Sequence, residues 1–533
     1  MIKRMIAIIL TASFLLCFTA CLGDHSDSRL IKYNLSEVPQ NLDPVLAEDT
    51  ASVIAVTNIF EGLVRKAPDG SLVPGVAERY EVSEDGLMYT FYLRKDAVWN
   101  NEEKTPLTAA DFLFGFQRLF DPASNSPTAS KLYCIKNSQA IHEGRLNVDQ
   151  LGVQAIDSHT LMIQLDYADV LFLDLLTTPS AMPCNREFFV STKGKYGLET
   201  DKILSNGPYY VKSWSKEKEN SYLALRKNVN YVSEVPVKNG GVSLFVNQDR
   251  EKAIDEFLEE KVDAIALSGT EISEIQGKGL NTDESVNSTW GILFNRGHEA
   301  ANAFLLQALM LDVDRNAYLN ILSDRYPMAM ALVPPNVKFG SDSYRKLVGE
   351  SAVPAYQPDQ ARSLYQQGLA QSGASALNDV SIIIPKEGDH HRIFSYLSQI
   401  WQQDLGFYIK TEVLENEEYQ DRLESGDYFC AIYQVTGDFN SPSAFLNQFS
   451  IASENLFSYR NEAFDAAVSV AERNDTLEGS LNAYFQAEKM LLQDAAFIPM
   501  YYETSYFAVS PSLTGFLYDF SSGIVDFKNV ELK

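Results

Sequence analysis

The sequence predicts an α/β or α+β body, because patterns typical of strands and patterns typical of helices are interspersed along most of it. Apolar and polar residues alternate at 89–93, 161–165 and 222–225, as in strands with one buried face. The chain has 533 residues, 45% of them hydrophobic, so it can bury a large core. At about 150 residues per domain, this length corresponds to roughly three structural units.

The N-terminus carries an apolar segment at 5–18 that follows two basic residues and precedes Cys21. About fourteen residues are too few for a membrane-spanning helix, which needs roughly twenty, but they suit a secretory signal. Thr19 and Ala20 before Cys21 are typical of the site at which a bacterial lipoprotein is cleaved and diacylated, although Phe18 replaces the usual leucine. We expect a lipid anchor on Cys21 that holds the body at the extracytoplasmic face of the membrane. A secreted protein in which Cys21 is incidental is the alternative.

Two helices of the body have sequence signals at their ends. Thr108, with Asp111 three residues later, forms a capping box before an apolar run. Pro358 opens a second helix, and Gly373 lies beyond its end. The sequence has no period of twenty to fifty residues and no Gly-, Pro- or Ser-rich interdomain linker, so a repeat array is excluded.

The net charge limits the partners that the protein can bind, and the number of cysteines limits the disulfides that it can form. A formal net charge of −27 argues against nucleic acid and anionic lipid as partners, since both require a cationic surface. Once the signal and Cys21 are set aside, Cys134, Cys184 and Cys430 remain, and this odd number leaves at least one free thiol. A disulfide between Cys134 and Cys184 is one arrangement, and three free thiols is the other.

A series of short motifs extends over nearly the whole mature chain. It begins with Leu42-Asp43-Pro44 and Ile59-Phe60-Glu61-Gly62-Leu63-Val64 and ends with Ile498-Pro499-Met500-Tyr501-Tyr502. Between them lie 74–78, 83–87, 91–95 with Trp99, 107–112, 206–209 with Trp214, 226–228, 308–315, 401–406 and 437–442. In this order they resemble the oligopeptide- and dipeptide-binding family, the solute-binding proteins of peptide-importing ABC transporters. Each motif is weak alone, but eight or more in order over about 490 residues are specific.

The resemblance implies a clamshell of the two-lobed periplasmic-binding-protein type, large cluster C, with an extra subdomain in the first lobe. It implies a hinge where the chain crosses between lobes, near Ser288 and near Tyr501. The expected divisions are a signal peptide at 1–20, an anchored linker at 21–29, a first lobe from 30–60, 205–288 and 502–533, its subdomain at 61–204, and a second lobe at 289–501. The implied partners are an oligopeptide and the permease and ATPase subunits of the importer, and we expect a monomer.

Peptide capture has requirements that follow from peptide chemistry. A buried ligand amine needs a carboxylate, and buried backbone groups need hydrogen-bond partners. Asp438 matches the family's aspartate that pairs with the ligand amine; an ordinary turn aspartate is the alternative. Glu48, Asp49 and Thr50 match the segment on one side of the peptide backbone. The segment from Val435 to Gly437 matches the other side.

The carboxylate end of the ligand is where this sequence departs from the family. The arginine that enteric oligopeptide binders place six residues before the aspartate is replaced by Ile432, and Arg296 stands one residue from the place of their lysine. His391 matches a histidine that helps to hold the C-termini of longer peptides. For His390 and His391 the alternative is a solvated helix start. A metal site is disfavoured because no Cys or carboxylate cluster accompanies the pair, and we expect neither metal nor cofactor.

Three classes of function remain open. The first is a binding protein that delivers peptides to an importer. The second is the same fold with another solute, such as a signalling peptide, an oligosaccharide or a metal chelate; only four tryptophans are available for stacking on a sugar. The third is a hydrolase or chaperone, and against catalysis stands the lack of a Gly-x-Ser-x-Gly or His-Glu-x-x-His motif.

Overall fold

The computed structural model describes residues 29–533 except 68–69, 218–220, 319–321, 323–325, 341, 350, 375, 378–379, 438, 452–457 and 475. The signal segment, Cys21 and Asp438 lie outside the described residues. Within the described part of the chain, no helix is both long enough and apolar enough to cross a membrane.

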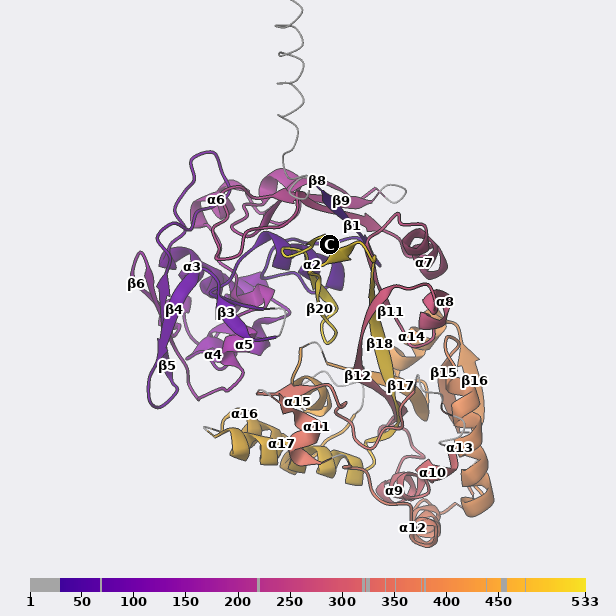
Figure 1. Cartoon of the computed structure of the whole chain (residues 1–533). Coiled ribbons are helices and arrows are strands. Elements are labelled where there is room, and N and C mark those ends of the chain that lie inside the picture. The colour runs from indigo at the N-terminus through magenta and orange to yellow at the C-terminus, as the bar shows by residue number, and fades with distance from the viewer. Residues whose placement is uncertain are drawn as a thin grey trace, which may run out of the picture.

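A ten-stranded mixed sheet extends through both halves of the molecule. Its strands, in spatial order, are β16 (Lys410–Leu414), β15 (Ser381–Pro385), β17 (Cys430–Thr436), β12 (Asn281–Phe294), β18 (Phe497–Val509), β11 (Ala264–Leu267), β1 (Leu30–Leu35), β10 (Gly241–Val246), β9 (Tyr222–Lys227) and β8 (Tyr209–Ser215). The long strands β12 and β18 pair antiparallel and run side by side between the two halves (Figure 1). The predicted crossings, Ser288 and Tyr501, lie within these two strands.

Two large hydrophobic cores divide the molecule into two lobes. The first core contains residues between Ile31 and Ala264 together with residues between Phe507 and Val530. The second core contains residues between Ile292 and Tyr501. The chain is therefore a two-lobed clamshell with mixed α/β content, as predicted, and each lobe buries its own apolar residues. The individual domain boundaries stay a prediction.

The first lobe carries a separate four-stranded antiparallel sheet of order β4-β5-β7-β6. Its strands are β4 (Ala77–Val82), β5 (Met88–Leu93), β7 (Thr160–Gln164) and β6 (Val153–Asp157). The strands predicted at 89–93, 161–165 and 222–225 coincide with β5, β7 and β9. The predicted capping box is also confirmed, since Thr108 N donates to Asp111 Oδ2 at 2.8 Å at the start of α3 (Ala109–Phe120).

The remaining elements of the first lobe pack around these two sheets. They are α2 (Thr50–Ile59), β2 (Val64–Lys66), β3 (Leu72–Pro74), α4 (Ser138–His142), α5 (Phe172–Leu175), α6 (Arg186–Ser191), α7 (Arg250–Leu258), α8 (Ile272–Ile275), β19 (Leu513–Thr514), β20 (Leu517–Asp519), β21 (Ile524–Asp526) and β22 (Glu531–Leu532). The strands β20 and β21 form a hairpin that projects from this lobe (Figure 1).

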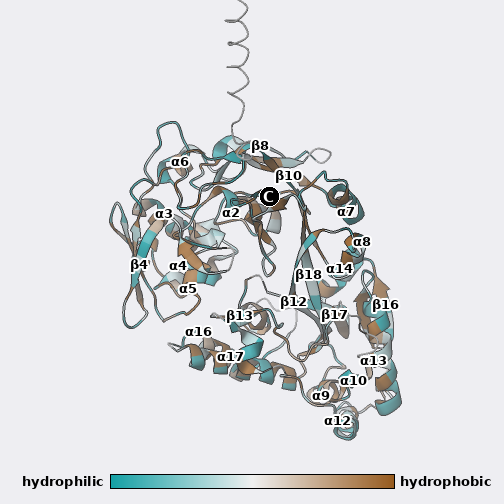
Figure 2. Ribbon diagram, in the orientation of Figure 1, coloured by the Kyte–Doolittle hydropathy of each residue, from teal (hydrophilic) through white to brown (hydrophobic). Residues whose placement is uncertain are grey.

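Helices dominate the second lobe. They are α9 (Ala303–Leu311), α10 (Arg315–Tyr318), α11 (Tyr344–Val348), α12 (Pro358–Gln371), α13 (His390–Leu405), α14 (Asn416–Ser425), α15 (Pro442–Leu446), α16 (Glu462–Glu472) and α17 (Leu477–Gln493), with the small hairpin β13 (Lys338–Phe339) and β14 (Asp342–Ser343). The helix predicted from Pro358 is confirmed as α12. Figure 2 shows α13 and α17 with both hydrophobic and hydrophilic residues, as expected for helices with one buried face.

The disulfide considered for Cys134 and Cys184 is wrong. Cys134, Cys184 and Cys430 are all free and buried. Cys184 Sγ lies 3.5 Å from Arg118 Nη1, beside the buried ion pair of Arg118 with Asp43, whereas the Cys134 thiol donates to Asp169. The two thiols thus belong to different local networks. Burial raises the pKa of Cys184 to about 11 and that of Cys134 well above its usual value, so both stay protonated at neutral pH.

Candidate functional site

One edge of β17 is only partly paired. On one side β17 pairs antiparallel with β12 from Cys430 to Thr436. On the other side it pairs parallel with β15 only at Cys430 and Ala431. From Ile432 to Thr436, no strand in the described ranges pairs with that second side. We call this segment the free edge only in the sense that no described strand pairs with it, since Tyr419 Oη donates to the Ile432 carbonyl at 2.6 Å and Gln448 Nε2 donates to the Thr436 carbonyl at 2.7 Å. An extended peptide can add to a strand edge through main-chain hydrogen bonds.

The free edge leads directly into the segment that was predicted to hold the ligand backbone. Val435 is fully buried, so its side chain is fixed in the second core. A Cβ at Gly437 would come within 2.7 Å of Phe445 Cε2 and 3.0 Å of Ala444 Cβ, so glycine allows the backbone to pass close to α15. The carboxylate of Asp438, the next residue, is not described, and its role as the amine ligand stays a prediction.

The matching segment of the first lobe lies at the start of α2. Asp49 is the N-cap of this helix, and its carboxylate accepts a hydrogen bond from Ser52 N at 2.7 Å. Glu48 and Thr50 are exposed. The Asp49 side chain is therefore committed to the helix, whereas the side chains of Glu48 and Thr50 remain exposed.

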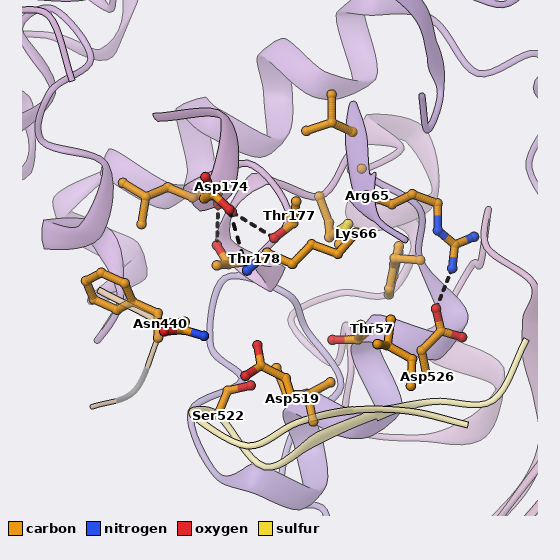
Figure 3. A pocket seen from close by; sticks show the side chains of 18 of the residues that line it. Thr57, Arg65, Lys66, Asp174, Thr177, Thr178, Asn440, Asp519, Ser522 and Asp526 are labelled. Atoms are coloured by element: carbon orange, nitrogen blue, oxygen red, sulfur yellow. Dashed lines mark hydrogen bonds and ion pairs between the residues drawn. The ribbon is translucent and has the colours of Figure 1, made fainter. Parts of the chain in front are cut away.

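A cavity lies where the first lobe meets Phe439, Asn440 and Ser441 of the second lobe (Figure 3), and its empty space together with the open solvent at its mouth is about 1020 Å³. These three residues directly follow position 438. The first-lobe walls come from α2, β2, residues 171–182 and the β20–β21 hairpin, and include the apolar side chains of Phe60, Val64, Leu171, Leu175, Met182, Leu517 and Ile524. An apolar cavity with a few polar groups is the usual form of a small-ligand site.

The basic groups of the cavity lining are paired with acids. Lys66 Nζ lies 3.6 Å from Asp174 Oδ1. Arg65 forms an ion pair with Asp526 and lies 3.6 Å from Glu61 Oε2. Neither cation is therefore free to attract an anionic ligand without first losing its partner.

A polar network joins the strands at the lobe crossing. Glu503 of β18 accepts hydrogen bonds from Trp290 Nε1 and Gln434 Nε2, each at 2.7 Å. Burial raises the pKa of Glu503. Sequence reasoning missed this acid, although a glutamate directly after the apolar motif that ends at Tyr502 is a usable signal. Because Gln434 belongs to the free edge, the network touches the candidate site.

The alternative interpretation of His390 and His391 as a solvated helix start is wrong for His390. His390 is 6% exposed, its ring lies 4.0 Å from that of Trp290, and its Nδ1 is hydrogen-bonded to the Tyr501 hydroxyl. Burial lowers the pKa of His390 to about 4, so it is neutral at pH 7. His391 is exposed in the first turn of α13, and its role at the ligand's C-terminus stays a prediction.

The other two candidates for the carboxylate end are engaged within the second lobe. Ile432 is 1% exposed and belongs to the second core. Arg296 Nη1 donates to the carbonyl oxygen of Asp494 at 2.8 Å, and its guanidinium lies 5.4 Å from the centre of the Tyr459 ring. Neither residue lines the cavity. Among the described residues, no group of three or more His, Cys, Asp or Glu could hold a metal ion.

The arrangement defines the class of protein: two lobes joined by crossing strands, with a cavity and a free strand edge at their junction, form a solute-binding clamshell. The family model of the bacterial extracellular solute-binding proteins, family 5 Middle, matches residues 71–456. The chain therefore belongs to family 5 of the bacterial extracellular solute-binding proteins.

Proteins similar to this chain carry different solute names. The oligopeptide-binding protein OppA of Bacillus subtilis (strain 168) is 25% identical over 96% of this chain and 94% of its own length. The "Probable deoxycholate-binding periplasmic protein YgiS" of Escherichia coli (strain K12) is 28% identical over 92% of this chain and 90% of its own length. The solved structure of the Escherichia coli murein tripeptide binding protein MppA has a TM-score of 0.76 and 25% identity, covering 95% of this chain and 99% of that protein.

Proposed function

We propose that this protein captures oligopeptides between its two lobes and delivers them to the permease of an ABC importer, while a lipid on Cys21 holds it at the extracytoplasmic face of the membrane. The free edge of β17 carries the proposal. A peptide backbone has the same donors and acceptors whatever its sequence, so pairing with a strand edge binds many peptides. The protein acts as a binding module and not as an enzyme.

The two ends of the free edge give the bound peptide a direction. Position 438 follows the last residue of β17 by two residues in the sequence, and there Asp438 would neutralise the ligand amine. The first turn of α13, with His391, follows β15, whose pairing with β17 stops at Ala431. We therefore place the amino end of the peptide next to Asp438 and its carboxyl end toward α13.

The crossing strands support closure on the ligand. The pairing of β12 with β18 is irregular between Val286 and Ser288 and again between Trp290 and Gly291. Such irregularities bend a strand locally, which suits a hinge that absorbs rotation between lobes. A peptide that contacts both lobes would then stabilise the closed state by its greater affinity for that state.

The second candidate function is the binding of another solute by the same fold. A non-peptide solute is included in the test because the relative YgiS is named as a probable deoxycholate-binding protein. Native mass spectrometry of protein purified without denaturation separates the two. A mixed ladder of peptide masses on the protein supports peptide capture for import. A single defined species, such as one signalling peptide, an oligosaccharide, a metal chelate or a steroid, would replace this conclusion with the second candidate.

A further inference from the structure

One acid in the cavity lining has no basic partner. Asp519 begins the turn between β20 and β21, and its Oδ1 accepts hydrogen bonds from Ser521 N at 2.9 Å and Ser521 Oγ at 2.5 Å. No ion pair of Asp519 occurs among the described residues. Figure 3 shows Asp519 on the side of the cavity opposite Lys66 and Asp174. The Asp519 carboxylate therefore brings an uncompensated negative charge to this space.

The cavity as a whole has more acids than bases. Its lining contains four carboxylates, on Glu61, Asp174, Asp519 and Asp526, and two cations, on Arg65 and Lys66. Since both cations are already paired, an incoming anion would meet unfavourable charge. An incoming cation would meet favourable charge, which a partly closed, largely apolar cavity screens less than bulk water does.

Two hydroxyl groups of the lining have unused hydrogen-bonding capacity. Thr57 Oγ1 and Ser522 Oγ are buried atoms that have no hydrogen-bond partner within the described part of the chain. Both residues line the cavity with Asp519 (Figure 3). Buried polar atoms normally have partners, so a ligand or water could pair with these two oxygens once their side chains rotate into the cavity. Ammonium and guanidinium groups carry donors only.

We propose that this cavity is a subsite for the side chain of a lysine or arginine at the amino end of the peptide, and that Asp519 determines this preference. The apolar walls would cover the methylene stem, while the carboxylate and the two hydroxyl oxygens accept from the charged head. The amino-terminal position follows from the second-lobe wall, because Phe439, Asn440 and Ser441 directly follow Asp438. This inference rests on the proposed capture of peptides.

The test compares two tetrapeptides by calorimetry, Lys-Ala-Ala-Ala and the same peptide with Nε-acetyl-lysine at position one, with Ala-Ala-Ala-Ala as a reference. Acetylation removes the side-chain charge and leaves the terminal amine free. We expect the wild-type protein to bind the lysine peptide about tenfold to a hundredfold more tightly than its acetylated form, the usual strength of a charge-assisted hydrogen bond.

Asp519→Asn should abolish this preference and leave affinity for the acetyl-lysine peptide unchanged. Its amide oxygen can still accept from Ser521 N, so the turn and the melting temperature should be retained. Asp421→Asn removes a charge from the exposed face of α14 and should keep the preference. Equal binding of the two lysine peptides by wild type, or a preference that survives in Asp519→Asn, overturns the subsite while peptide capture stands. If none of the three peptides binds, both proposals fall.

Discussion

Asp312 should make the folded protein less stable as pH rises toward neutrality. Its side chain is 0% exposed, and within the described ranges neither carboxylate oxygen has a hydrogen-bond partner. It also caps the C-terminus of α9, where the helix dipole disfavours a negative charge. Burial, followed by the nearby charge of Asp404, raises the pKa of Asp312 from 3.8 to about 7.

The size of the effect follows from proton linkage. Between pH 4 and 7 the folded state holds a proton on Asp312 that the unfolded state has released, so the free energy of unfolding falls as pH rises. One pKa unit corresponds to about 1.4 kcal/mol, and a rise from 3.8 to about 7 therefore corresponds to a loss of about 4 kcal/mol above pH 7. Below pH 4 this carboxyl group has no such effect.

Asp312→Asn replaces the carboxyl group by a neutral group of the same shape. We expect the variant to match wild type near pH 4 and to be more stable than wild type near pH 8. Urea unfolding followed by circular dichroism, at one-unit steps from pH 4 to 8, measures the difference. Asp421→Asn, an exposed change, should follow the wild-type profile. Parallel curves for wild type and Asp312→Asn would refute the argument, because the Asp312 pKa would then be the same in both states.

Three further predictions concern the anchor, the ligand and the hinge. Cys21→Ser should abolish labelling by a fatty-acid analogue and move the protein out of the membrane fraction; unchanged labelling would rule out the lipid anchor. Asp438→Asn should weaken peptide binding by about a hundredfold to several thousandfold, as expected for a buried pair that loses one partner, and peptide N-acetylation should add little to that loss in calorimetry. Equal wild-type affinity for acetylated and free peptides would contradict this role. Saturating peptide should reduce the radius of gyration in X-ray scattering, and an unchanged profile would count against closure.

Local signals in the sequence predicted much of the fold. The strands at 89–93 and 161–165 follow from alternation, and the start of α3 follows from the side chains of Thr108 and Asp111. These features depend on neighbours within a few residues, which is the range over which such patterns act. The order of family motifs supplied the two-lobed architecture, which no local pattern contains.

Features that depend on distant residues were missed or wrong. His390 is buried because Trp290 and Tyr501, from two other elements, pack on its ring. Cys134 and Cys184 stay apart because each has its own polar partner. The cavity brings Thr57, Asp519 and Ser522 together from opposite ends of the chain, and each of them alone is an ordinary surface residue type.

The free edge of β17 would allow the proposed peptide site to tolerate Ile432 at the place where the family resemblance predicts an arginine. The edge exists because pairing with β15 ends at Ala431. Main-chain groups would provide the affinity common to all peptides, so side chains around the edge are free to change. Side chains near the edge would then determine which peptides bind most tightly. They are Asp519, in the cavity near the amino end of the ligand, and Glu503, Trp290 and Gln434 along the strands. Acids at these two places would favour cationic peptides over anionic ones, and the comparison of lysine with acetyl-lysine tests this at the amino end of the ligand.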